Sequence, residues 1–192
     1  MILFLIGLVL FLGFHSLRIF APAHREQMVS RFGEQGFKII YSVLSVLTLV
    51  LLIFGYAHAP VINVWFPPAG MNHLTITLML FASICLFASL IPAGHIAVKT
   101  KHPLVLSVKI WAFAHLFSNG DLVSILLFVG FLAWGVVMRI SLKRRERAGL
   151  PVLRPFVAGR YDLYALLLGI VFWAAMIFKL HELLIGVAPL PM

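Results

Sequence analysis

Six apolar segments follow one another along the chain, separated by short connections. They cover about residues 2–20, 37–57, 73–96, 103–117, 122–140 and 161–181. Most are close to the roughly 20 residues that a helix needs to cross the hydrocarbon core of a bilayer. Charged residues make up only 11% of the chain, far below their share in soluble domains. The pattern predicts an all-α, polytopic transmembrane helical bundle of about six spans, with residues 1–192 forming a single domain.

Basic residues gather in alternate connections between these segments. The first, third and fifth connections hold most of the Lys and Arg residues, including the basic run 143–147. The second connection, from Pro60 to Asn72, carries no charge. Because cytoplasmic connections are enriched in Lys and Arg, we expect these three connections in the cytoplasm and both termini outside. The expected location is therefore a membrane that the chain crosses several times.

The net charge of +9 would suggest a nucleic-acid partner in a soluble protein, but here the charges lie between apolar spans. Membrane topology and anionic lipid headgroups on the cytoplasmic side explain them, so no nucleic-acid partner is expected. The single cysteine, Cys85, excludes an intramolecular disulfide and a thiolate-held cluster. A metal site would therefore depend on other side chains.

Histidines are the candidate functional side chains of the interior. Of eight histidines, only His15 and His115 lie clearly within spans, and no Asp or Glu lies in the middle of a span. A carboxylate-bridged di-iron site and a carboxylate proton relay are therefore disfavoured. Two imidazoles from different helices can bind haem iron, and basic side chains can pair with the propionates. We predict haem b, with its iron bound by His15 and His115 and its propionates near Arg18 and Lys109.

The fourth span carries a polar stripe. Trp111, His115 and Asn119 recur every four residues and so share one face of a helix. His102 precedes Pro103, a residue that favours the first turn of a helix. His102 and His115 are about 220° apart around the helix and about 20 Å apart along it, so they cannot bind one metal together. We expect Trp111 and Asn119 to line the haem site, and His102 to support it or to mark the helix start.

The depth of the two predicted iron ligands differs. His15 lies about five residues from the cytoplasmic end of its span, and His115 lies about thirteen residues from Pro103, a mismatch of about 12 Å if both helices stand upright. A fourth span that begins near Lys109 would remove most of this difference. His95 is the alternative ligand if it does not.

Several short motifs occur in a fixed order along the chain. They are His15-Ser16-Leu17-Arg18, Lys101-His102-Pro103, the segment 111–116, and Asn119-Gly120-Asp121. In this order and spacing the chain resembles the NnrU family of integral membrane proteins over essentially its whole length. Bacterial members are associated with denitrification and nitric oxide metabolism. The resemblance therefore implies a redox or isomerase-like role and a location in the bacterial inner (plasma) membrane.

Plant zeta-carotene isomerase looks like a relative of this family. In that enzyme haem b supports the cis-to-trans isomerisation of a polyene. The resemblance matches its haem-binding histidines to His15 and His115 here, and its His-Pro histidine to His102.

Two other functions fit the sequence. The His-Pro motif is also similar to that of membrane methyltransferases for isoprenylcysteine or phospholipid, which hold S-adenosylmethionine with Arg-His-Pro and a late pair of Glu residues. Here Lys101 replaces the Arg, and Glu182 is the single late acid. The chain would alternatively be a non-enzymatic accessory factor for a respiratory or redox partner.

Overall fold

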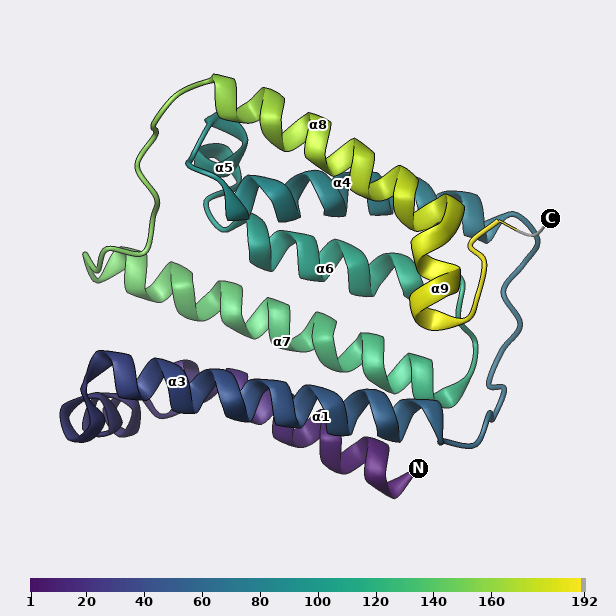
Figure 1. Ribbon diagram of the computed structural model, residues 1–192, viewed down its shortest axis with the longest axis horizontal. Coiled ribbons are helices and arrows are strands. Elements are labelled where there is room, and N and C mark those ends of the chain that lie inside the picture. The colour runs from purple at the N-terminus through teal and green to yellow at the C-terminus, as the bar shows by residue number, and fades with distance from the viewer. Residues whose placement is uncertain (191–192) are drawn as a thin grey trace.

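Helices form all the regular secondary structure that the computed structural model describes, which covers residues 1–190, apart from one isolated β-bridge between Asn63 and Asp121. The helices lie side by side in one elongated bundle (Figure 1). Their bounds are α1 (Ile2–His15), α2 (Leu17–Phe20), α3 (Pro22–Ala57), α4 (Met71–Leu90), α5 (His95–Thr100), α6 (Pro103–Leu116), α7 (Leu122–Arg147), α8 (Arg160–Ala175), the π-helical turn η1 (Met176–Leu180) and α9 (His181–Ile185).

Four helical segments of residues 1–190 are long and apolar enough to cross a membrane. They are α3, α4, α7 and the continuous segment Arg160–Ile185. The helices α1 and α6 are also apolar, but each has 14 residues and a length of about 21 Å, less than the thickness of a hydrocarbon core. The predicted all-helical membrane fold is confirmed, whereas the count of six spans stays a prediction. The start of α1 and the helix α9 lie toward the same end of the bundle, and their side of the membrane also stays a prediction (Figure 1).

Proline explains two helix boundaries that differ from the predicted spans. Ile91, which precedes Pro92, is extended (φ −105°, ψ 167°), because a proline ring disfavours the helical conformation of the residue before it. The helix α4 therefore ends at Leu90, six residues before the end of the predicted segment 73–96. Pro22 likewise begins α3 well before the predicted residue 37. This long helix is kinked at Gly33, where φ is +72°.

Glycines allow the closest helix approaches. A Cβ atom added to Gly55 of α3 would lie 2.6 Å from the backbone N of Phe4 in α1. A Cβ atom added to Gly169 of α8 would lie 2.8 Å from the Cα of Ile84 in α4. Without a hydrophobic driving force between helices in lipid, such close backbone packing is a main source of helix association.

Polar side chains also connect neighbouring helices inside the bundle. The Tyr56 hydroxyl of α3 and the Ser124 hydroxyl of α7 are hydrogen-bonded at 2.7 Å, and Ser124 is fully buried. The Ser107 hydroxyl of α6 donates to the carbonyl of Ala82 in α4 at 2.7 Å. These bonds satisfy buried polar groups and fix the helices relative to one another.

The α1–α3 contact should not tolerate a methyl group on Gly55. We expect Gly55→Ala to lower the free energy of unfolding by about 1–3 kcal/mol, because the new Cβ atom would overlap the backbone of Phe4. Gly13→Ala is the matched control, since an added Cβ atom there meets nothing within 4 Å. Circular dichroism melting of the detergent-purified variants measures the effect. Equal melting temperatures for the two variants would contradict the tight contact.

The hydrogen bond between Tyr56 and Ser124 gives a second expectation. Tyr56→Phe should destabilise the protein by about 1–3 kcal/mol, because it leaves the buried Ser124 hydroxyl without this partner. The double variant with Ser124→Ala should recover part of the loss, since it removes both polar groups. The same melting experiment measures both variants. A double variant that loses the sum of the two single losses would refute the coupling.

Candidate functional site

The two ends of the bundle differ in charge. At one end, which we call the basic end, the start of α6 meets the end of α7, and Lys101 forms an ion pair with Glu146. At the other end, which we call the α9 end, the last turn of α6 lies beside α9 (Figure 1). The candidate residues divide between these two places.

His115 lies at the α9 end, in the last turn of α6. Its Nδ1–H donates to the carbonyl oxygen of Trp111 at 2.8 Å, since a carbonyl oxygen can only accept. Its ring lies 4.8 Å from the ring of the buried Phe128 in α7. The ring of His181, the first residue of α9, lies 6.4 Å away, and the two imidazole planes differ by only 18°.

His181 carries the same kind of hydrogen bond as His115. Its Nδ1–H donates to the carbonyl oxygen of Val187 at 2.7 Å. In both histidines Nδ1 is therefore protonated, so in the neutral tautomer the lone pair is on Nε2. A neutral imidazole whose Nδ1–H is held by a carbonyl is the form that commonly binds metals. The 6.4 Å between ring centres is close to the roughly 6 Å expected when two imidazoles share one metal, given metal–nitrogen bonds of about 2 Å.

Trp111 and Asn119, both predicted to line the site, are brought to His115. The Trp111 ring lies 5.6 Å from the His115 ring and 5.2 Å from the Phe128 ring. The Asn119 Nδ2–H donates to the backbone carbonyl of His115 at 2.8 Å. The Asn119 side chain thereby holds the last turn of α6.

His15, the other predicted iron ligand, lies in a different cluster between α1 and α3. Its Nδ1–H donates to the carbonyl of Phe11 at 2.8 Å, and its Nε2 lies 3.4 Å from the Ser45 hydroxyl. The Tyr41 ring is 5.7 Å away. Among residues 1–190, none of these partners of His15 is also a hydrogen-bond or ring partner of His115.

Phe131 of α7 shows how far apart the two predicted ligands are. Its ring contacts Phe11 of α1 at 5.7 Å and Trp111 of α6 at 5.3 Å, so these three residues mark one level of the bundle. His15 lies four residues beyond Phe11 toward the basic end, and His115 lies four residues beyond Trp111 toward the α9 end. This places them about 12 Å apart along the bundle axis. Among residues 1–190 no hydrogen bond or ring contact joins His15 to His115, and their pairing at one iron stays a prediction.

The two predicted propionate partners are also separated. Arg18 lies at the basic end, within electrostatic range of Arg25 and Arg145. Lys109 lies in α6, where its aliphatic stem packs over Gly135 of α7. Lys109 is about 9 Å along α6 from His115, whereas Arg18 belongs to the opposite end of the bundle from His115.

His102 and His95 lie at the basic end, away from His115. His102 precedes α6, and its buried Nε2 has no hydrogen-bond partner among residues 1–190. Burial, reinforced by the nearby Arg139, lowers the pKa of His102, so its ring is neutral at pH 7.

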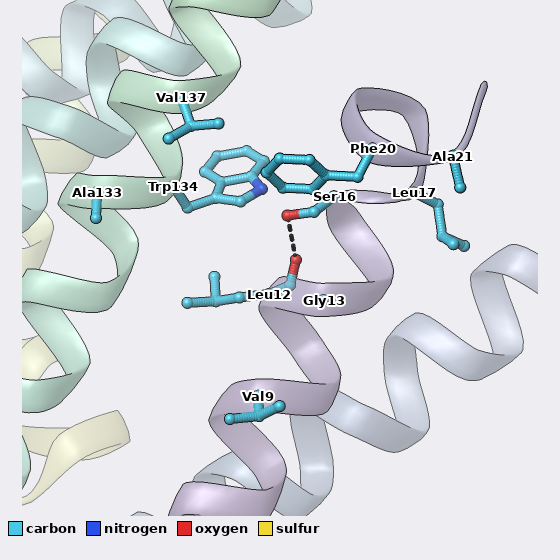
Figure 2. A pocket seen from close by; sticks show the side chains of 10 residues that line it. All are labelled: Val9, Leu12, Gly13, Ser16, Leu17, Phe20, Ala21, Ala133, Trp134 and Val137. Atoms are coloured by element: carbon cyan, nitrogen blue, oxygen red, sulfur yellow. Dashed lines mark hydrogen bonds between the residues drawn. The ribbon is translucent and has the colours of Figure 1, made fainter.

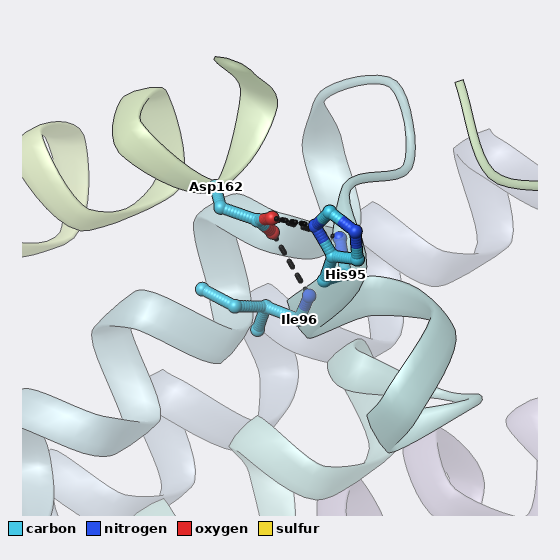
Figure 3. Close-up of polar contacts among 3 residues, drawn as sticks. All are labelled: His95, Ile96 and Asp162. Carbon is cyan, nitrogen blue, oxygen red and sulfur yellow. Dashed lines mark hydrogen bonds and ion pairs between the residues drawn. The ribbon is translucent and has the colours of Figure 1, made fainter. Parts of the chain in front are cut away.

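The His95 Nδ1–H donates to Asp162 at 2.9 Å, and the backbone N–H groups of His95 and Ile96 donate to the same carboxylate (Figure 3). Asp162 thereby caps the start of α5. The same carboxylate accepts a hydrogen bond from His95, which was the alternative iron ligand.

The two groups that the methyltransferase interpretation requires are not adjacent. His102 lies before the first turn of α6, whereas Glu182 lies in α9, next to His181 and the last turn of α6. Glu182 pairs instead with the exposed Lys179 at 3.2 Å.

An apolar groove of about 420 Å³ lies between α1 and α7 (Figure 2). The Trp134 and Phe20 side chains both line it, and the Ser16 hydroxyl donates back to the carbonyl of Leu12 at 2.6 Å. Among residues 1–190 no histidine lines the groove. It offers an apolar surface without a metal ligand.

The nearness of His181 to His115 was not predicted from the sequence. The sequence places His181 near the outer end of the last span, at a similar expected depth to His115, and that depth was the available signal. The contact between the two rings depends on how η1 and α9 turn the chain, which the apolar pattern does not reveal.

Comparison with known proteins identifies the family. The sequence model of the family described as NnrU protein matches residues 3–189, almost the entire chain. No curated protein and no solved structure matches the chain significantly. Helices long and apolar enough to span a membrane agree with a family of membrane proteins. This chain belongs to the NnrU protein family.

Proposed function

We propose that this NnrU-family protein binds haem b at the α9 end of its bundle, where His115 and His181 would hold the iron. The observation that carries the proposal is the pair of nearly parallel imidazole rings, 6.4 Å apart between centres. Each ring has its Nδ1–H committed to a backbone carbonyl, at 2.8 Å for His115 and 2.7 Å for His181. His181 takes the place that the sequence assigned to His15.

The surroundings of the two rings suit an apolar macrocycle. Phe128 and Trp111 supply aromatic surface beside His115. The Trp111 carbonyl, by accepting from Nδ1–H, fixes the ring orientation and makes Nε2 a stronger donor to a metal. Lys109, on the side of α6 that packs against α7, is the basic residue closest along α6 to this site and is proposed to contact a propionate.

Bound haem b would supply a one-electron redox couple or a Lewis-acidic iron. The chain itself supplies two neutral imidazoles, an apolar enclosure and an amide, Asn119, that holds the backbone of His115 in place. With the family resemblance, this supports a redox or isomerase-like role connected with nitric oxide metabolism in the bacterial inner membrane. A respiratory or redox protein would then be the electron partner.

In this proposal His15 has a packing role. It joins α1 to α3 through the 3.4 Å contact with Ser45 and the ring contact with Tyr41. Arg18, among Arg25 and Arg145, belongs to the cytoplasmic charge that sets the topology.

Absorbance spectra of the detergent-purified protein, prepared with added haem, test the proposal. The wild-type protein should show the sharp bands of low-spin, six-coordinate haem after reduction. His115→Ala and His181→Ala should each abolish these bands, because each removes one axial ligand. His15→Ala should retain them.

His58→Ala is the matched control for these variants. His58 is exposed and makes the same type of bond, from Nδ1–H to the carbonyl of Phe54 at 2.9 Å, but it faces no second histidine among residues 1–190. It should keep the wild-type spectrum and melting temperature. A colourless wild-type protein would refute haem binding. A spectrum lost in His15→Ala and retained in His181→Ala would instead support the pair predicted from the sequence.

A further inference from the structure

A pocket of about 350 Å³ lies at the basic end, between the start of α6 and the end of α7. It is lined by Lys101, Arg139, Lys143, Glu146 and Arg147. Four of these side chains are cationic and one is a carboxylate, so the lining carries a net charge of +3 (4 − 1). This pocket is separate from the proposed haem site, because His115 and His181 lie at the opposite end of the bundle.

The single acid of the pocket is already engaged. Glu146 forms an ion pair and a hydrogen bond with Lys101. Arg139, Lys143 and Arg147 follow one another at intervals of four residues, so they share one face of α7. Like charges at this spacing repel one another, and no second acid in the lining offsets the repulsion.

Buried polar atoms beside the pocket need a partner. Arg139 Nη1 is buried and has no hydrogen-bond acceptor among residues 1–190. A buried guanidinium N–H group without an acceptor is unfavourable, and guanidinium groups form strong paired hydrogen bonds with phosphate. His102, within electrostatic range of Arg139, also has a buried nitrogen, Nε2, without a partner there.

The surface next to the pocket is apolar. Val136 and Ile140 of α7, on either side of Arg139 in the sequence, are exposed hydrophobic residues. A ligand that fits both surfaces carries an anionic group and a hydrocarbon chain. We infer that the basic pocket binds the phosphate of an anionic phospholipid, whose acyl chains lie along the apolar surface of α7.

Native mass spectrometry of the full chain in detergent tests this assignment, with dioleoylphosphatidylglycerol as the probe and dioleoylphosphatidylcholine as the neutral comparison. The wild-type protein should retain phosphatidylglycerol in preference to phosphatidylcholine. Arg139→Gln should weaken phosphatidylglycerol binding by about fivefold or more, and Lys143→Gln should weaken it in the same direction. Lys143 is exposed, so its substitution leaves the packed interior intact.

Arg144→Gln is the matched control, because Arg144 is exposed on the same helix and does not line the pocket. It removes the same charge and should keep wild-type affinity. Equal losses in Arg144→Gln and Lys143→Gln would overturn the proposal in favour of general surface attraction. Equal retention of the two lipids, or full displacement of phosphatidylglycerol by millimolar inorganic phosphate, would also overturn it.

Discussion

The arrangement of this bundle depends on one constraint: polar side chains in an apolar interior must find partners within the helices. Backbone carbonyl oxygens meet much of this need. The imidazoles of His15 and His115 both donate to the carbonyl four residues earlier, and Ser107 donates to a carbonyl of the neighbouring helix. Because water is scarce in a bilayer core, each such bond fixes a rotamer as well as satisfying a donor. For the histidines it also fixes the tautomer, which decides which nitrogen is open to a metal.

Close packing and these hydrogen bonds act together. Gly55 allows α3 to approach α1, and the next residue, Tyr56, reaches the buried hydroxyl of Ser124 in α7. Gly169 brings α8 against α4, where Trp173 one turn later donates its indole N–H to the carbonyl of Ile76 at 2.8 Å. A small residue therefore sets the helix spacing, and a neighbouring polar residue sets the register.

Much of the fold could be predicted because it follows from local chemistry. Apolar runs gave the helices, and the prolines at 22, 92 and 103 account for helix boundaries. The site could be predicted only in part, because it depends on relative depth and on long-range contacts. Trp111, His115 and Asn119 share a helical stripe, which a spacing of four residues reveals. The distance of His15 from His115 depends on how α1 and α6 pass Phe131, and the approach of His181 depends on the fold of the last helix.

The π-helical turn η1 has a consequence for the direction of the last histidine. Residues 176–180 widen the helix, so His181 begins α9 in a different angular register from the one that a regular α-helix would give it. Each residue of an α-helix adds about 100° of rotation, more than a residue of the wider π-helix adds. Winding the same five residues as a regular α-helix would therefore turn His181 away from its present direction. The wider winding of this short turn, and not only the identity of the histidine, would then decide whether a homologue keeps the imidazole pair.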